Sequence, residues 1–217
     1  MLNLIASRPE IVTSIKGVIQ AGVGKEAGET DYWMSKGYNQ LYFEPLQSSF
    51  EHLQSKLVTN YAGIKNVRAF NVALGDHSSK KPFYVTTDLD SSSLLPLNAS
   101  RPKKVGNMQQ SNTIVVDVVT LDTFMILHPE IRPLDYNLLF MDTQCTEDKV
   151  LDGAVETLKN IDYVTAEVAY VQVYEGSITY DQFIRKMDYL GYRVLATLNI
   201  PQYEDIAQEI LFGRKDK

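Results

Sequence analysis

A short glycine-containing turn constrains this chain more than any other feature. Gly22-Val-Gly24 follows the apolar run 17–19, and about twenty residues later Glu44 ends a second apolar run at Leu41-Tyr-Phe-Glu44-Pro45. Glycines let the backbone of a turn approach a ligand closely. A carboxylate at the end of the next strand can accept the hydroxyl groups of a ribose. The two features together predict a site for an adenosine-type cofactor, without specifying which one.

Composition and charge exclude several classes of protein. The chain has 217 residues, of which 44% are hydrophobic and 22% charged, so we expect one domain, residues 1–217, with a full core. A net charge of -6 argues against nucleic-acid binding, which needs clustered Lys and Arg. The single cysteine fits a reducing compartment, and neither a signal peptide nor a membrane-spanning run is evident. We therefore expect a cytoplasmic protein without membrane insertion.

Apolar runs alternate with amphipathic segments along most of the chain. The pattern predicts strands at 18–21, 40–43, 67–70, 136–141 and 162–168, and helices at 29–35, from Pro45 onward, from Leu121 onward, at 149–159 and at 180–190. Such alternation is typical of right-handed crossovers and a mostly parallel sheet with helices on both faces. The last two apolar runs, 192–198 and 209–213, indicate a closing antiparallel hairpin. The expected fold class is α/β and Rossmann-like.

Two segments depart from this alternation. Residues 1–17 are predicted to form a helical flank, with a capping box from Ser7 to Glu10. Residues 83–117 contain two further strands, 83–86 and 113–117, around a stretch rich in Ser, Pro and Asn. We interpret this region as an antiparallel excursion with a long loop, of a length that is usually functional or disordered. The loop is expected to help select the substrate.

The glycine turn leaves two cofactors open. Gly22-x-Gly24-x-x-Ala27, with Glu44 on the ribose, also fits a loose dinucleotide fingerprint, so a nicotinamide-dependent oxidoreductase is one alternative. The excursion after the third strand and the closing hairpin favour the other, an S-adenosylmethionine-dependent methyltransferase. No pair among the three histidines has the spacing of metal ligands, and we expect no metal site.

Several motifs in a fixed order carry a family resemblance. They are Val18-Ile-Gln-Ala-Gly22, Phe43-Glu-Pro45, Phe70-Asn-Val-Ala73, Thr120-Leu-Asp122, Leu139-Phe-Met-Asp-Thr-Gln-Cys-Thr-Glu147 and Val150-Leu-Asp-Gly-Ala154. From about Val18 to Gly213 the chain resembles the FkbM family of S-adenosylmethionine-dependent methyltransferases, with a class I methyltransferase sheet. It departs from the family pattern at Gln20, where Asp or His is usual, and at Cys145 and Thr146, where Gly and Ala are common.

The resemblance implies O-methylation of a hydroxyl group, often on a saccharide or glycan, with S-adenosylmethionine as the cofactor. The cofactor-binding residues that it implies are Gln20, Gly22, Gly24, Glu44, Asn71, Ala73 and Asp142. Asp142 and Glu147 are the candidate catalytic carboxylates, because a carboxylate near the acceptor can remove its proton. Ser92 and Glu167 are the candidate substrate contacts. Gln20 and Cys145 leave a third reading open, in which the chain is a catalytically weak relative or an interaction module.

Overall fold

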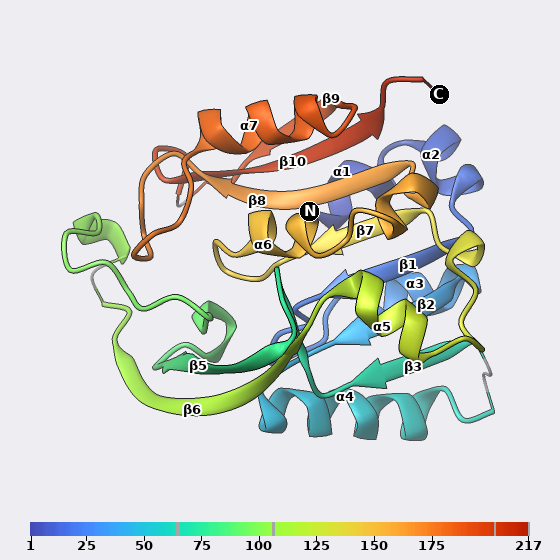
Figure 1. Cartoon of the computed structure of the whole chain (residues 1–217), viewed down its shortest axis with the longest axis horizontal. Helices are drawn as coiled ribbons and strands as arrows, with labels where there is room; N and C mark the ends of the chain where they lie inside the picture. The colour runs from blue at the N-terminus through green and yellow to red at the C-terminus, as the bar shows by residue number, and fades with distance from the viewer. Residues whose placement is uncertain (64–65, 106, 202, 217) are drawn as a thin grey trace.

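Seven strands form the central sheet in the computed structural model, which describes residues 1–63, 66–105, 107–201 and 203–216. The strand order is β3-β2-β1-β7-β8-β10-β9 (Figure 1). The strands are β1 (Gly17–Ala21), β2 (Asn39–Phe43), β3 (Val67–Phe70), β7 (Leu138–Met141), β8 (Tyr163–Ala169), β9 (Tyr192–Asn199) and β10 (Ala207–Arg214). The pairs from β3 to β8 are parallel, whereas β10 is antiparallel to both β8 and β9. The predicted mostly parallel sheet with a closing hairpin is confirmed.

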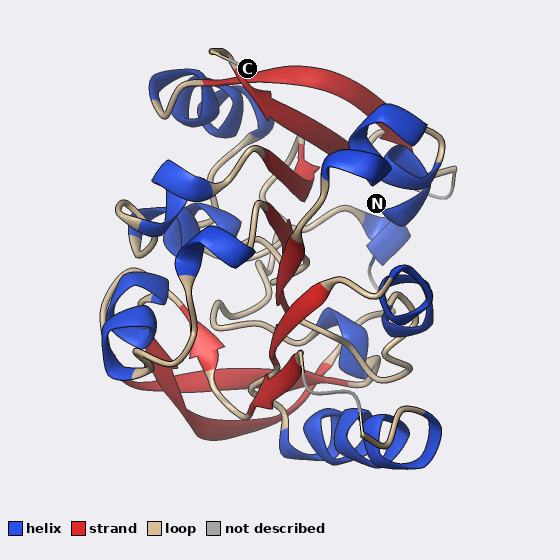
Figure 2. Cartoon of the chain, turned by 90° about the vertical axis from the view of Figure 1, so that its right-hand side faces the viewer, coloured by secondary structure: helices blue, strands red, loops and turns tan. Residues whose placement is uncertain are grey.

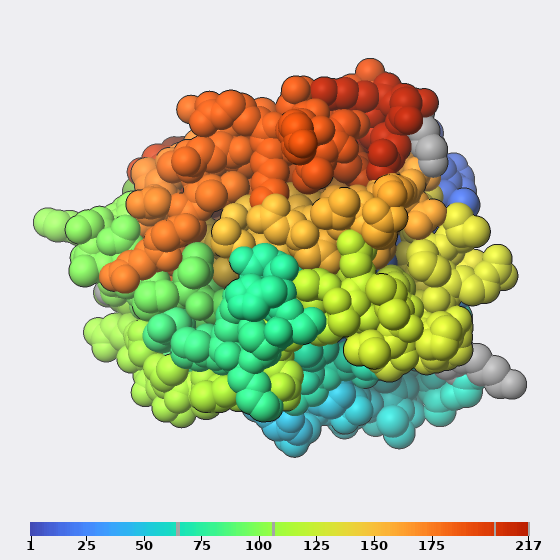
Figure 3. All heavy atoms as spheres, in the orientation of Figure 1, coloured from blue at the N-terminus to red at the C-terminus, as the bar shows by residue number. Residues whose placement is uncertain are grey.

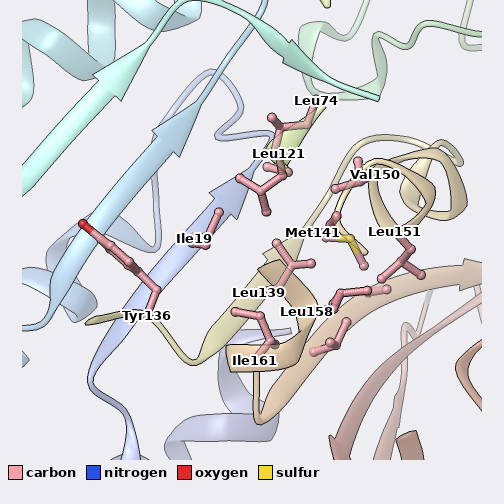
Figure 4. Close-up of a cluster of buried hydrophobic side chains, with 14 of the residues drawn as sticks. Ile19, Leu74, Leu121, Tyr136, Leu139, Met141, Val150, Leu151, Leu158 and Ile161 are labelled. Carbon is pink, nitrogen blue, oxygen red and sulfur yellow. The ribbon is translucent and has the colours of Figure 1, made fainter. Parts of the chain in front are cut away.

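Helices cover both faces of this sheet (Figure 2). They are α1 (Leu2–Ala6), α2 (Pro9–Ser14), α3 (Thr30–Lys36), α4 (Gln47–Asn60), α5 (Leu121–Leu127), α6 (Glu147–Asp152) and α7 (Tyr180–Tyr189). Side chains alternate across a strand. Accordingly, Leu139 and Met141 of β7 join the apolar cluster under α5, α6 and α7, while Leu138 and Phe140 join the cluster under α1, α2 and α3. Figure 4 shows part of the first cluster, with Leu151 of α6 beside Met141.

A second, smaller sheet holds the excursion that follows β3. Its strands are β4 (Ala73–Leu74), β5 (Ser79–Thr86) and β6 (Gln110–Val119), in the order β4-β6-β5, with β5 and β6 antiparallel. The loop between β5 and β6 contains two short 3-10 helices, η1 (Leu89–Ser91) and η2 (Lys103–Val105). This loop lies against the segment after β8, where Asn98 N donates to Val173 O at 2.9 Å. In Figures 1 and 3 the loop is green and the segment after β8 is orange, and the two lie side by side.

The predicted helix 149–159 is wrong in its bounds. α6 ends at Asp152, and a separate 3-10 helix, η4, runs over Thr157–Asn160. The break comes at Gly153, where a Cβ atom would lie 2.0 Å from the carbonyl oxygen of Gly75, so the two backbones touch there. The apolar side chains of this stretch that form the predicted inward face are buried all the same: Val150, Leu151, Ala154 and Leu158.

Two helix starts also differ from the prediction. The capping box at Ser7 is absent, because α2 begins at Pro9 with Arg8 as its N-cap and has no side-chain cap. The guanidinium of Arg8 instead donates to Leu4 O at 2.6 Å. The helix expected from Pro45 begins at Gln47, since the side chain of Glu44 binds the backbone ahead of it.

Candidate functional site

A cavity of about 250 Å³ lies where β1, β2 and β7 end. Its wall includes the turn 22–29, Glu44, the segment 142–144 and part of the excursion loop. The predicted site residues that line it are Gln20, Gly22, Gly24, Glu44, Ala73, Ser92 and Asp142. The structure therefore brings most of the predicted site into one place, although these residues span five separate stretches of the chain.

Glycine is required at the first position of the turn. Gly22 has a φ of +78°, and a Cβ atom there would lie 1.9 Å from the carbonyl oxygen of Asp142. Gly24 has a φ of +71°, also in the left-handed region that side chains disfavour. The ends of β1 and β7 thus meet in direct backbone contact at the floor of the cavity.

The carboxylate of Glu44 holds this turn in place. Its Oε2 accepts hydrogen bonds from Val23 N at 3.0 Å and Gly24 N at 3.2 Å, and its Oε1 accepts one from Leu46 N at 2.8 Å. Glu44 is buried, and burial raises its pKa, while the three N–H donors oppose that shift. A carboxylate oxygen can accept two hydrogen bonds. Oε1 therefore keeps capacity for a ligand hydroxyl.

A second carboxylate, Asp90 of η1, completes the clamp on the turn. Lys25 N donates to Asp90 Oδ1 at 2.5 Å. The amides of Val23, Gly24 and Lys25 are thus bonded to the protein's own carboxylates. In a dinucleotide site, backbone amides at this position face a pyrophosphate. A pyrophosphate here would meet two carboxylates instead, which argues against the nicotinamide alternative.

Asp142 ends β7 and faces the cavity. Gln144 Nε2 donates to its Oδ1 at 2.8 Å. Burial raises the pKa of Asp142 to about 6, and the negative charges of Glu29 and Asp90 add to that shift. This carboxylate is therefore a proton acceptor at neutral pH that can be protonated a little below it.

Glu147 and Glu167, which are predicted to contact a ligand, lie outside the cavity lining. Glu147 opens α6 and accepts hydrogen bonds from Thr143 N at 2.7 Å and Thr143 Oγ1 at 3.0 Å. Burial raises its pKa to about 7. Glu167 of β8 lies opposite Glu209 of β10, and burial together with Asp142 and Glu147 raises its pKa to about 8. Glu147 thus lies behind Thr143, which lines the cavity.

Asn71 also differs from the expectation that it lines the cavity. Its side-chain Nδ2 donates to Glu44 O at 2.9 Å and to Pro45 O at 3.1 Å. The side chain therefore holds the backbone that carries Glu44. Ala73, two residues later, does line the cavity.

The segment after Asp142 has an unusual backbone. Gln144 and Cys145 have φ values of +54° and +67°, a region that is sparsely populated by residues other than glycine. The excursion loop packs on this bend, since Ser93 Oγ donates to Gln144 O at 2.7 Å. Burial raises the pKa of the Cys145 thiol, which suits a packing role for that side chain rather than a nucleophilic one.

Several lining residues were missed by the sequence reasoning. They are Val23, Lys25, Glu26, Glu29, Asp90, Thr143 and Gln144, among others. Glu26 and Glu29 follow the glycine turn directly, and that proximity was a usable signal. Asp90 carried no such signal, because only the tertiary packing of η1 brings it to Lys25.

Two further properties concern the described residues as a whole. No group of three or more His, Cys, Asp or Glu side chains among them is arranged to hold a metal ion. In the same part of the chain, every helix is too short or too polar to cross a bilayer.

Comparison with protein families decides the broad class. A family model described as the methyltransferase FkbM domain matches residues 21–194. The chain belongs to the FkbM methyltransferase family. The match begins at residue 21, so it includes Gly22 and Cys145 but not Gln20.

Solved structures share the fold of this FkbM-family chain. A methyltransferase FkbM from Methylobacillus flagellatus KT is 11% identical with a TM-score of 0.53, and the match covers 89% of this chain but 43% of that one. Sp1610 from Streptococcus pneumoniae, solved in complex with S-adenosyl-L-methionine, is 6% identical with a TM-score of 0.51. The match covers 97% of this chain and 73% of that one. A METTL16 methyltransferase domain is 9% identical with a TM-score of 0.52, and the match covers 98% of this chain and 81% of that one. No curated protein matches the chain.

Proposed function

We propose that this chain is an S-adenosylmethionine-dependent O-methyltransferase that acts on a hydroxyl group, in a saccharide or glycan. Membership of the FkbM family supports the methyltransferase class. The observation that carries the proposal is the position of Glu44. Its carboxylate is tied to the glycine turn, lines the cavity and retains acceptor capacity on Oε1.

The residues of the cavity fit this cofactor. Glu44 Oε1 would accept a ribose hydroxyl, and the apolar side chains of Leu74, Phe83 and Leu89 offer surface for the adenine ring. Gln20 and Asp142, at the ends of β1 and β7, would lie beside the methionine part. When bound, the cofactor supplies a methyl group on a sulfonium, which is activated without help from the protein.

Asp142 would serve as the general base. With a pKa of about 6, it is largely ionised at pH 7 to 8 and can take the proton of an acceptor hydroxyl. Gln144 Nε2 orients the carboxylate by its hydrogen bond to Oδ1. The charge of Asp142 in turn raises the pKa of Glu147 and of Glu167, neither of which lines the cavity.

The excursion loop would choose the acceptor. Leu89, Ser92 and Leu94 of this loop line the cavity beside Asp142. Ser92 Oγ accepts a hydrogen bond from Thr86 N at 3.1 Å, so its hydroxyl hydrogen is free to point at a ligand oxygen. Loops of this kind carry specificity on a scaffold that other parts of the chain keep rigid.

Calorimetry with S-adenosylhomocysteine tests cofactor binding. We expect the wild type to bind and Glu44→Gln to lose about tenfold or more in affinity, because one charged acceptor to a hydroxyl is removed. Glu51→Gln, at an exposed position on α4, is the matched control and should bind S-adenosylhomocysteine with the affinity of the wild type. No binding by the wild type at millimolar ligand would reject the proposal.

A panel of neutral saccharides tests the acceptor. Turnover of S-adenosylmethionine that depends on a saccharide, with the methyl group found on oxygen by mass spectrometry and NMR, is the expected result. Methylation confined to nitrogen or carbon acceptors would contradict the O-methyltransferase assignment.

One observation favours a catalytically weak relative as the second candidate. By the family resemblance, Gln20 stands where Asp or His is usual and Cys145 where Gly is common, and Cys145 adopts a φ of +67°. This candidate predicts cofactor binding without turnover for any acceptor. Turnover above background with one acceptor would remove it.

A further inference from the structure

Glu29 is a cavity residue without a partner. It precedes α3 as the N-cap residue and lines the cavity together with Gln20 and Asp142. Its carboxylate makes no hydrogen bond or ion pair with the side chains and backbone groups that the structure describes. Its charge nevertheless reaches Asp142, whose pKa it helps to raise. A partly buried carboxylate facing another across a cavity is a favourable place for a cation.

Gln20 supplies an independent observation at the same wall. The side chain is 2% exposed. Its Nε2 donates to Gly22 O at 3.2 Å, but its Oε1 has no hydrogen-bond partner among the described residues. Buried acceptors are almost always satisfied. Because Gln20 belongs to the cavity wall, its unsatisfied carbonyl oxygen calls for a ligand with an N–H or O–H donor.

The protein itself provides little positive charge here. Lys25 is the one Lys or Arg among the residues that line the cavity, and its Nζ lies 3.7 Å from Glu26 Oε1 on the exposed rim. Glu44 and Asp90 are occupied by backbone amides. Glu29, Asp142 and Gln20 all line the cavity, so two carboxylates and an unsatisfied amide oxygen in its wall call for a positive charge and a hydrogen-bond donor.

We propose that Glu29 and Gln20 form a binding corner for a primary ammonium group, with Glu29 providing the countercharge and Gln20 Oε1 accepting an N–H. This inference rests on the proposed function, and it assigns the corner to the ammonium group of the methionine part of S-adenosylmethionine. Glu29 would thereby supply the negative charge that position 20 lacks in this chain. Of the charged groups of that ligand, the sulfonium has no hydrogen to donate, and the carboxylate would be repelled by Glu29.

Two ligands and two variants test the assignment. S-adenosylhomocysteine carries the ammonium group, whereas 5′-methylthioadenosine has the same nucleoside and thioether sulfur without the amino acid. Calorimetry on Glu29→Gln should show about a tenfold loss of affinity for S-adenosylhomocysteine, with 5′-methylthioadenosine unchanged within about twofold. Glu51→Gln removes the same charge at an exposed position of α4, outside the cavity lining, and should alter neither affinity by more than about twofold.

The outcomes separate this inference from the function beneath it. Unchanged affinity of Glu29→Gln for S-adenosylhomocysteine, or an equal loss for both ligands, would overturn the ammonium corner while cofactor binding stands. A gain in affinity would place the ligand carboxylate beside Glu29 and also overturn it. Failure of the wild type to bind either ligand would reject the proposed function, and the corner with it. Thermal unfolding of each variant verifies that the fold is retained.

Discussion

Replacing the buried Glu147 by Gln should make the stability of the folded protein depend less on pH. Glu147 is 4% exposed, and burial raises its pKa from the ordinary 4.5 to about 7. The folded state therefore holds the proton more tightly than the unfolded state. Stability is highest where both states are protonated and falls as the pH rises between 4.5 and 7.

The size of the effect follows from the two pKa values. Proton linkage for a single carboxyl with this shift gives a loss of about 2.5 kcal/mol in unfolding free energy between pH 5 and pH 8. Asp142 and Glu167 are shifted in the same direction and add to the decline. Glu147→Gln resembles the protonated form and keeps an oxygen for Thr143 N. The variant should match the wild type near pH 5 and exceed it by about 2 kcal/mol at pH 8.

Urea unfolding at several pH values measures this directly. The fluorescence of Trp33, the single tryptophan and fully buried, reports the transition. Glu51→Gln, on the exposed surface of α4, is the control and should follow the wild-type curve. Parallel pH curves for wild type and Glu147→Gln, or a variant that is less stable at every pH, would refute the reasoning.

Two further predictions concern the backbone around the cavity, and urea unfolding checks both. Gly22→Ala should lower the free energy of unfolding by at least about 2 kcal/mol, because its Cβ would meet Asp142 O. Gly28→Ala is the control, since no atom lies within 4 Å of its Cβ, and it should stay within about 0.5 kcal/mol of the wild type. Equal effects of the two substitutions would contradict the contact. Cys145→Val should cost about 2 kcal/mol, since a β-branched residue resists a φ of +67°, and Cys145→Gly should cost less; the reverse order would show that thiol packing outweighs backbone strain.

The sequence was sufficient for the sheet because its strands have distinctive patterns. Short, largely apolar runs between helical segments located β1, β2 and β7, and the final pair of runs located the hairpin. The carboxyl-end rule then placed Glu44 and Asp142 in one cavity. The bounds of the helices were harder to predict from the sequence. α6 ends where Gly153 touches Gly75, and this contact joins segments that are distant along the chain.

The directions of several side chains around the cavity depend on tertiary contacts that no local sequence pattern encodes. Glu147 was expected beside the ligand, but Thr143 binds its carboxylate behind the wall. Asn71 follows a strand as expected, yet its side chain turns to the carbonyls of Glu44 and Pro45. Asp90 reaches Lys25 from the middle of a long loop. In each case the side chain's partner, rather than its place along a strand, fixed its direction.

The clamping of the glycine turn has a consequence for how a nucleoside would arrive. Since Glu44 and Asp90 already fix the amides of residues 23–25, this rim is shaped in the absence of a ligand. Association then requires little loss of loop entropy there, so more of the contact energy appears as affinity. A preorganised rim also implies that a nucleoside docks at that end without rearrangement of residues 23–25, as long as η1 of the excursion loop stays in place.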